Sequence, residues 1–206
     1  LAGPGTYAEQ LVIDKAITLR GPNFDKTGFA TDRVAEAIVT FPSGITENGP
    51  ALVEVEADGV TIEGFTFQST DDYLGQFTSL IHTFSTNNFV VRNNILNGTE
   101  LGIYRDPYNP DFVYGDNTGW LIEGNLIDGI ENRYVNSRVG RGIYIYRAGA
   151  TVQNNKVINH NIGIQILPAT AAEGGVVQNN TIIAGRTGLY HNGAQKGSGD
   201  WLYTNN

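Results

Sequence analysis

The chain has 206 residues, enough for one domain with a sizeable core, and 40% of them are hydrophobic, which excludes a disordered chain. Only 17% are charged and the formal net charge is −8, so the basic patch of a nucleic-acid binder and a polybasic membrane-binding segment are both missing. Cysteine is absent, which excludes disulfides and cysteine-based zinc sites, and no apolar run approaches the roughly 20 residues that would insert across a membrane.

A local pattern of apolar run, polar turn and apolar run recurs along the chain. In each copy an apolar residue is followed by a polar residue and then by a pair such as Asn-Asn or Gly-Asn. The apolar residues that begin these copies are Ile62, Val91, Ile122, Val152, Val177 and Tyr203, spaced 29, 31, 30, 25 and 26 residues apart. A recurrence at this period indicates a repeat architecture.

A second series of short runs, each centred on a glycine, accompanies the first. Its members are Leu101-Gly-Ile-Tyr104, Arg141-Gly-Ile-Tyr-Ile-Tyr146, Ile162-Gly-Ile-Gln-Ile166 and Thr187-Gly-Leu-Tyr190. Runs of three to six residues suit strands and are too short for helices. We therefore predict an all-β fold, a parallel β-helix (solenoid) of roughly seven rungs that forms a single domain over residues 1–206.

The recurring asparagine pairs have a place in such a solenoid. Asparagine tolerates the left-handed backbone conformation that a tight corner needs. Equivalent residues stack at a spacing of about 4.8 Å in successive rungs, so that an asparagine can bond to its copy in the next rung. We expect the pairs to form corners and an asparagine ladder.

The stretch from Gly3 to Gly21, GPGTYAEQLVIDKAITLRG, is similar to the opening rungs of secreted bacterial β-helices, and ADGVTIEGFTF at 57–67 resembles their next module. The whole chain thus resembles the right-handed parallel β-helix repeat family, the pectate-lyase-like superfamily. This resemblance implies a right-handed solenoid and an extracellular or cell-surface location, but the fold carries many functions. Neither end has the polar cap that solenoids need, so we expect a portion of a longer chain.

A partial resemblance to pectin methylesterases points to catalytic candidates. Gln76 fits the first glutamine of that family, Asp111 in DFVYG fits its nucleophile, and Arg141 fits its arginine without the following Pro-Trp. However, Leu101 stands where the general acid belongs. Since the reaction needs one carboxylate as nucleophile and a second as proton donor, the resemblance argues against an active esterase.

Calcium-dependent lyase chemistry is another enzymatic alternative. Asp71 and Asp72 form the acidic pair that could take part in holding a calcium ion. A solvated acidic loop explains the same pair. We therefore commit to no cofactor and keep calcium as an alternative.

Two irregular inserts, residues 105–120 and 131–138, are expected to protrude as loops, where binding residues tend to lie. Their aromatic and polar side chains suit sugar rings, although the same aromatics could simply pack the inserts onto the solenoid. The candidates for glycan contact are Tyr104, Arg105, Asp106, Tyr108, Tyr114 and Tyr134.

We therefore favour a structural or adhesive segment of an extracellular or cell-surface protein, with glycan contact, over an enzyme. Its expected partners are polysaccharide or copies of itself end to end, and not nucleic acid. The alternative is a carbohydrate-active enzyme, pectin esterase-like or polysaccharide lyase-like, that acts on acidic polysaccharide.

Overall fold

The computed structural model describes residues 1–45, 51–69, 78–84, 86–98, 101–105, 117–129, 140–168, 173–192 and 200–206, with only the backbone of Arg105. These ranges contain strands, turns and bends, and within them no helix is formed. Accordingly, the described part of the chain has no helix that is long and apolar enough to cross a membrane.

The strands form three parallel sheets, A, B and C, with seven strands in each. Sheet A contains β1 (Gly5–Ala8), β4 (Ala37–Thr40), β7 (Thr66–Gln68), β10 (Ile95–Asn97), β13 (Leu126–Asp128), β16 (Lys156–Ile158) and β19 (Thr181–Ile183). Sheet B contains β2 (Leu11–Ile13), β5 (Ala51–Val55), β8 (Ser79–Thr83), β11 (Leu101–Arg105), β14 (Arg141–Tyr146), β17 (Ile162–Leu167) and β20 (Thr187–His191). Sheet C contains β3 (Thr18–Arg20), β6 (Thr61–Glu63), β9 (Val90–Arg92), β12 (Asn117–Glu123), β15 (Ala148–Gln153), β18 (Gly175–Gln178) and β21 (Trp201–Thr204).

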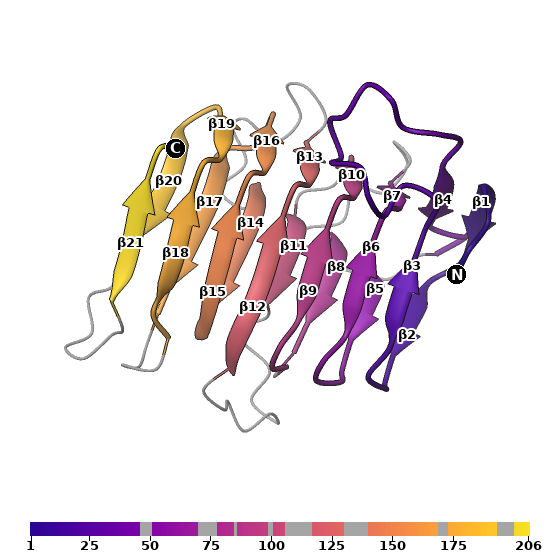
Figure 1. Cartoon of the computed structure of the whole chain (residues 1–206), viewed down its shortest axis with the longest axis horizontal. Helices are drawn as coiled ribbons and strands as arrows, with labels where there is room; N and C mark the ends of the chain where they lie inside the picture. Colours follow the sequence, from indigo (N-terminus) through magenta and orange to yellow (C-terminus); the bar gives the residue numbers. More distant parts are fainter. Residues whose placement is uncertain are drawn as a thin grey trace.

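The chain visits the sheets in the order A, B, C and then climbs to the next turn, as in a β-helix. Figure 1 looks onto sheet C with sheet B behind it, and the termini lie at opposite ends of the long axis. The predicted all-β solenoid is confirmed. We predicted roughly seven rungs. Each sheet has seven strands, and about five turns of the solenoid have a neighbouring turn on both sides.

The residues that define the sequence repeat form one inward column of sheet C. Successive strands pair Ile62 with Val91, Val91 with Ile122, Ile122 with Val152, Val152 with Val177 and Val177 with Tyr203. All but Tyr203 are fully buried in the hydrophobic core. Below them, β3 adds Leu19 to the same column, paired with Ile62. The recurrence therefore arises because each copy fills the same core position.

The asparagine pairs form the corner between each sheet C strand and the following sheet A strand, here called the C–A corner. The first member of the pair has a left-handed backbone, as at Asn93 (φ 60°) and Asn154 (φ 54°), and Gly64 and Gly124 serve the same purpose where asparagine is missing. The second member turns inward. Both predicted roles of the asparagine pair are therefore found, but in different residues: the first member forms the corner, and the second member forms the ladder.

The inward asparagines make a continuous ladder through the solenoid. In Asn155, for example, Oδ1 accepts from the backbone N and from Nδ2 of Asn125, both at 3.0 Å, while Nδ2 donates to the carbonyl of Ile122 at 2.9 Å. The same three bonds recur from rung to rung. The members are Asn94, Asn125, Asn155, Asn180 and Asn206. Each amide therefore joins two turns and saturates buried backbone groups at the corner.

The glycines of the second sequence series form a column where sheet B lies against sheet A. A Cβ on Gly142 would lie 2.3 Å from Val157 Cγ1 and 2.8 Å from the carbonyl oxygen of Gly163, and a Cβ on Gly163 would lie 2.3 Å from Ile182. Because a real Cβ cannot approach so closely, only glycine fits at these two positions. The close approach of the two sheets explains why glycine recurs.

Polar side chains also link turns on the outer face of sheet C. The carboxylate of Glu63, which is fully buried, receives the Nε groups of Arg20 at 2.5 Å and Arg92 at 2.6 Å. Further along, Gln153 Nε2 donates to Glu123 at 2.7 Å and Gln178 Nε2 to Gln153 at 2.8 Å. These side chains occupy the same outward position in successive strands of sheet C. The position is held by charged residues in the first turns and by glutamines in the later ones.

Residues 21–36, between β3 and β4, interrupt the regular repeat and lie along the C–A corner. We call this segment the strap. Its backbone amides bond to the corners of two turns, with Gly21 N to the Glu63 carbonyl at 2.8 Å and Gly28 N to the Gly124 carbonyl at 2.7 Å, and the Phe24 carbonyl accepts from Asn93 at the corner between them. In Figure 1 it forms the high arch above the N-terminal strands of sheet A.

Candidate functional site

The outer face of sheet B carries a column of aromatic and polar side chains that we treat as the candidate site. In register along the sheet, its members are Val12, Glu54, His82, Tyr104, Tyr144, Gln165 and Tyr190. The adjacent strand positions, such as Ile81, Ile103 and Ile143, are fully buried in the core. This alternation places the column on the outer face. We call it the B column.

The aromatic rings of the B column stack on one another along the solenoid axis. The centroids of His82 and Tyr104 are 5.3 Å apart with ring planes 27° apart, and those of Tyr104 and Tyr144 are 5.5 Å apart with planes 16° apart. Such spacings are typical of favourable aromatic pairs. Tyr104 is only 9% exposed. This predicted glycan contact therefore has an aromatic neighbour on each side within the column.

A carboxylate and an imidazole meet at the N-terminal part of the column. His82 Nδ1 lies 3.9 Å from Glu54 Oε1, close enough for an ion pair when the imidazole is protonated. The nearby His82 lowers the pKa of the Glu54 carboxyl, and partial burial opposes that shift. His82 Nε2 is buried and has no hydrogen-bond partner. The pair brings a carboxylate and an imidazole together on this face.

Two arginines lie beside tyrosine rings in the fifth turn. The guanidinium carbon of Arg141 is 4.9 Å from the ring centroid of Tyr144, and Arg141 Nε donates to Gln165 Oε1 in the next turn. The guanidinium carbon of Arg147, just after β14, is 5.4 Å from the ring centroid of Tyr146. Arg141 is thus a member of an aromatic and amide cluster, in contact with the B column.

Most of the other predicted site residues lie outside the described part of the chain. These are Gln76 and Asp111, the acidic pair Asp71 and Asp72, and the insert residues Asp106, Tyr108, Tyr114 and Tyr134. Arg105 ends β11, and its side chain also lies outside the description. Convergence of Gln76 and Asp111 with Arg141 therefore stays a prediction, as does calcium near Asp71. Within the described ranges, no three His, Asp or Glu side chains gather as metal ligands.

Of the seven members of the B column, only Tyr104 was among the predicted site residues. Glu54, His82 and Gln165 occupy the position that Tyr104 and Tyr144 occupy in their own turns. The sequence does mark Gln165, because it stands two residues after the glycine of its repeat, as Tyr104 does. This signal is weaker at Glu54 and His82, whose strands have no glycine at the equivalent place.

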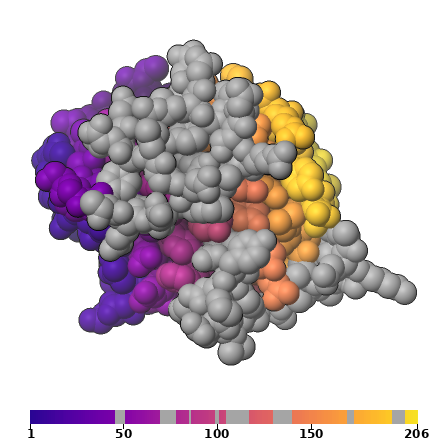
Figure 2. Space-filling view, turned by 180° about the vertical axis from the view of Figure 1, so that it is seen from behind, coloured from indigo at the N-terminus to yellow at the C-terminus, as the bar shows by residue number. Residues whose placement is uncertain are grey.

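In the space-filling view from behind, the turns follow one another in chain order across the molecule (Figure 2). A ligand that extends along the solenoid axis would therefore contact side chains from several turns. The class that these observations define is a parallel β-helix with a stacked aromatic and polar column on one sheet.

No protein-family model, no curated protein and no solved structure matches the chain. The β-helix implied by the resemblance to the pectate-lyase-like superfamily is confirmed by the three sheets. Membership of that superfamily and the likeness to pectin methylesterases stay predictions.

Proposed function

We propose that the chain is a structural and adhesive β-helix segment of an extracellular or cell-surface protein, and that it contacts acidic polysaccharide through the outer face of sheet B. The observation that carries the structural part is the asparagine ladder, in which Asn94, Asn125, Asn155, Asn180 and Asn206 join turn to turn. Polar groups used in this way make a stiff rod that holds its outer face in a fixed shape.

The arginine and tyrosine cluster supports the polysaccharide contact. In a chain with a formal net charge of −8, Arg141 and Arg147 bring two positive charges to the same turn. A guanidinium group matches the geometry of a carboxylate, and the partly buried Tyr146 beside Arg147 offers apolar ring surface and a hydroxyl group, whereas Tyr144 beside Arg141 is only 6% exposed. A sugar acid presents the complementary set of groups.

Affinity electrophoresis tests this contact directly. The protein is run in native gels that contain polygalacturonate, methyl-esterified pectin or alginate, beside gels without polysaccharide. We expect retardation by at least one acidic polysaccharide, and loss of most of it in the Arg141→Gln, Arg147→Gln double variant. Lys15→Gln is the control, because Lys15 is an exposed cation between β2 and β3 in the first turn, whereas Arg141 and Arg147 lie at the two ends of β14. Equal retardation of both variants would contradict the assignment to sheet B.

The alternative is a carbohydrate-active enzyme, and one observation favours it. Glu54 and His82 supply a carboxylate and an imidazole on the face that also carries Arg141. Groups of these types perform general acid–base catalysis. Release of methanol from esterified pectin, or of unsaturated products from polygalacturonate or alginate, would support this alternative and contradict a purely structural role.

End-to-end association of copies is a separate part of the proposal. Sedimentation velocity over a range of protein concentrations tests it, since stacking of copies increases the sedimentation coefficient as the concentration rises. A single unchanged species at all concentrations would remove self-association from the proposal.

A further inference from the structure

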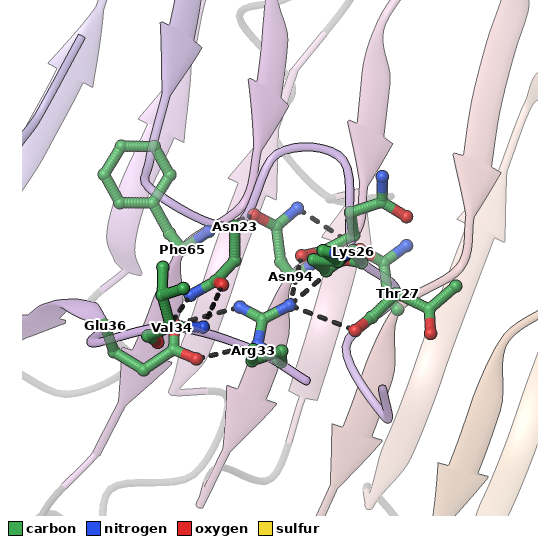
Figure 3. A network of polar contacts seen from close by, with 10 residues as sticks. Asn23, Lys26, Thr27, Arg33, Val34, Glu36, Phe65 and Asn94 are labelled. Atoms are coloured by element: carbon green, nitrogen blue, oxygen red, sulfur yellow. Dashed lines mark hydrogen bonds and ion pairs between the residues drawn. The ribbon is translucent and has the colours of Figure 1, made fainter. Parts of the chain in front are cut away.

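The strap is held rigidly on the C–A corner by the side chain of Arg33. Its Nη1 donates to the carbonyls of Lys26 and Thr27, both at 3.1 Å, and of Asn93 at 3.0 Å. The other side of the guanidinium forms a fork with Glu36, with Nε to Oε1 at 2.7 Å and Nη2 to Oε2 at 2.9 Å. Figure 3 shows Arg33 at the centre of this network.

A second set of bonds closes the strap on itself and onto the corner. Asn23, which is fully buried, donates from Nδ2 to the Val34 carbonyl at 3.0 Å and accepts from Val34 N at 2.7 Å. Asn93 Nδ2 donates to the Phe24 carbonyl at 2.7 Å. Both limbs of the strap are therefore fixed before any ligand arrives, which lowers the entropic cost of binding.

The strap reverses the usual placement of polar and apolar side chains. Asn23 and Arg33 point inward, whereas Phe24, Phe29 and Val34 are 38%, 42% and 59% exposed. The other large exposed apolar side chains among the described residues all belong to the first or last turn: Leu1, Val12, Ile17, Ile183, Tyr190 and Leu202. Between the two ends, the exposed apolar surface of the described residues is thus concentrated on the strap.

The spacing of the two phenylalanines follows from the corners beneath them. Asn23 N bonds to the carbonyl of Gly64 and Gly28 N to that of Gly124, so Phe24 and Phe29 follow contacts that are two rungs apart. Two rungs correspond to about 10 Å. On one side of Phe24, the guanidinium of Arg20 lies 4.5 Å from the ring centroid and holds the ring in place. This separation suits alternate sugar units of an extended oligosaccharide.

Charge indicates an uncharged ligand. Lys26 Nζ is 2.6 Å from Asp32 Oδ2, and Arg33 is paired with Glu36. With Asp25, residues 21–36 carry three acidic and two basic side chains. An acidic polysaccharide would meet no surplus of positive charge on the strap itself, in contrast to the Arg141 cluster.

The size of the exposed surface argues against a second copy as the partner. Together the three apolar side chains leave roughly 250 Å² accessible, given the usual area of such side chains. A stable protein interface buries about 800 Å² on each partner. Peptides in turn bind at a free sheet edge or in a groove, whereas the strap amides of Gly21, Asn23 and Gly28 are already bonded to the solenoid.

We propose that the strap is a binding surface for a neutral glycan chain, in which Phe24 and Phe29 pack against the apolar faces of pyranose rings. It is separate from the site proposed on sheet B, and it goes beyond that proposal in place and in ligand class. The paired Lys26 and Asp32 of the same segment would supply polar groups for sugar hydroxyls.

The test titrates the protein with cellohexaose and with xylohexaose by isothermal calorimetry, with trigalacturonate as the acidic comparison. We expect binding of at least one neutral hexasaccharide. Phe24→Ala and Phe29→Ala should each weaken it about tenfold, the effect typical of truncating an aromatic contact residue. Leu202→Ala, which truncates a 57% exposed leucine away from the strap, should leave the affinity unchanged. Circular dichroism of each variant checks that the fold is retained.

Phe24→Leu keeps the apolar bulk without a flat ring, and it provides a second test if the alanine variant unfolds. A tenfold loss in Phe24→Leu supports stacking on the ring. Failure of the wild-type protein to bind either neutral hexasaccharide would overturn the proposal, as would an equal loss in Leu202→Ala. Loss of self-association in the Phe24→Ala, Phe29→Ala double variant would assign the surface to protein contact instead. Arg141→Gln should leave neutral binding intact, so the two sites can fail independently.

Discussion

Replacing Asn155 by alanine removes one step of the asparagine ladder. Asn155 Oδ1 accepts from two donors of Asn125, its backbone N and its Nδ2, and Asn155 Nδ2 donates to the Ile122 carbonyl. Asn125 is fully buried, so neither of its donors can turn to solvent. The backbone N of Asn125 is left unpaired, at about 1–3 kcal/mol, and its Nδ2, which keeps the Val91 carbonyl at 2.9 Å, loses one bond of about 1 kcal/mol, so the free energy of unfolding should fall by about 3 kcal/mol.

The neighbouring Asn154 provides the matched control. It is exposed and has a φ of 54°, a conformation that glycine adopts freely and alanine adopts at a cost of about 1 kcal/mol. We expect Asn154→Gly to be almost neutral and Asn154→Ala to cost about 1 kcal/mol.

Urea denaturation followed by circular dichroism measures all three variants under the same conditions. If Asn155→Ala costs no more than Asn154→Ala, the ladder bonds do not stabilise the solenoid as argued. Asn155→Asp adds a test of the same geometry. The carboxylate would face the Ile122 carbonyl, so this variant should gain stability as the pH falls and its carboxyl becomes protonated and able to donate.

Two further predictions concern packing and pH. Gly142→Ala should cost about 1–3 kcal/mol, because its Cβ would lie 2.3 Å from Val157, whereas Gly188→Ala in the same column, 3.7 Å from Ile182, should be tolerated; equal losses in urea denaturation would refute the column. Burial lowers the pKa of His160 to about 4, so the unfolded chain takes up a proton below about pH 6.5 while the folded ring stays neutral. Stability should therefore fall by about 3 kcal/mol as the pH drops from 6.5 to 4. His160→Leu should remove that part of the slope, since neither ring nitrogen has a hydrogen-bond partner; an unchanged slope would refute the assignment to His160.

The sequence was sufficient to predict the fold because each rung repeats the same physical requirements. Val91, Ile122 and Val152 recur since they fill one core column, and Asn94 and Asn125 recur since each bonds to the next. Which asparagine of a pair turns inward could not be read from the letters alone. That choice depends on the backbone conformation at the corner, which asparagine and glycine share.

The candidate site was less predictable, and for different reasons. Tyr104 was named with the irregular inserts and Arg141 from the resemblance to pectin methylesterases, but Glu54 and His82 join the column only through the register between turns. The strap was missed because its partners are remote in sequence. Arg33 bonds to Asn93, 60 residues away, and no local pattern marks that contact.

The strap also changes how the solenoid is expected to fold. In a regular solenoid each turn contacts only its neighbours, so folding can begin at any point and spread from turn to turn. The bonds from Arg33 to Asn93 and from Gly28 to Gly124 exist only after later turns have been added. The N-terminal turns should therefore gain their full protection from hydrogen exchange as one cooperative unit, while the turns beyond the strap open more independently.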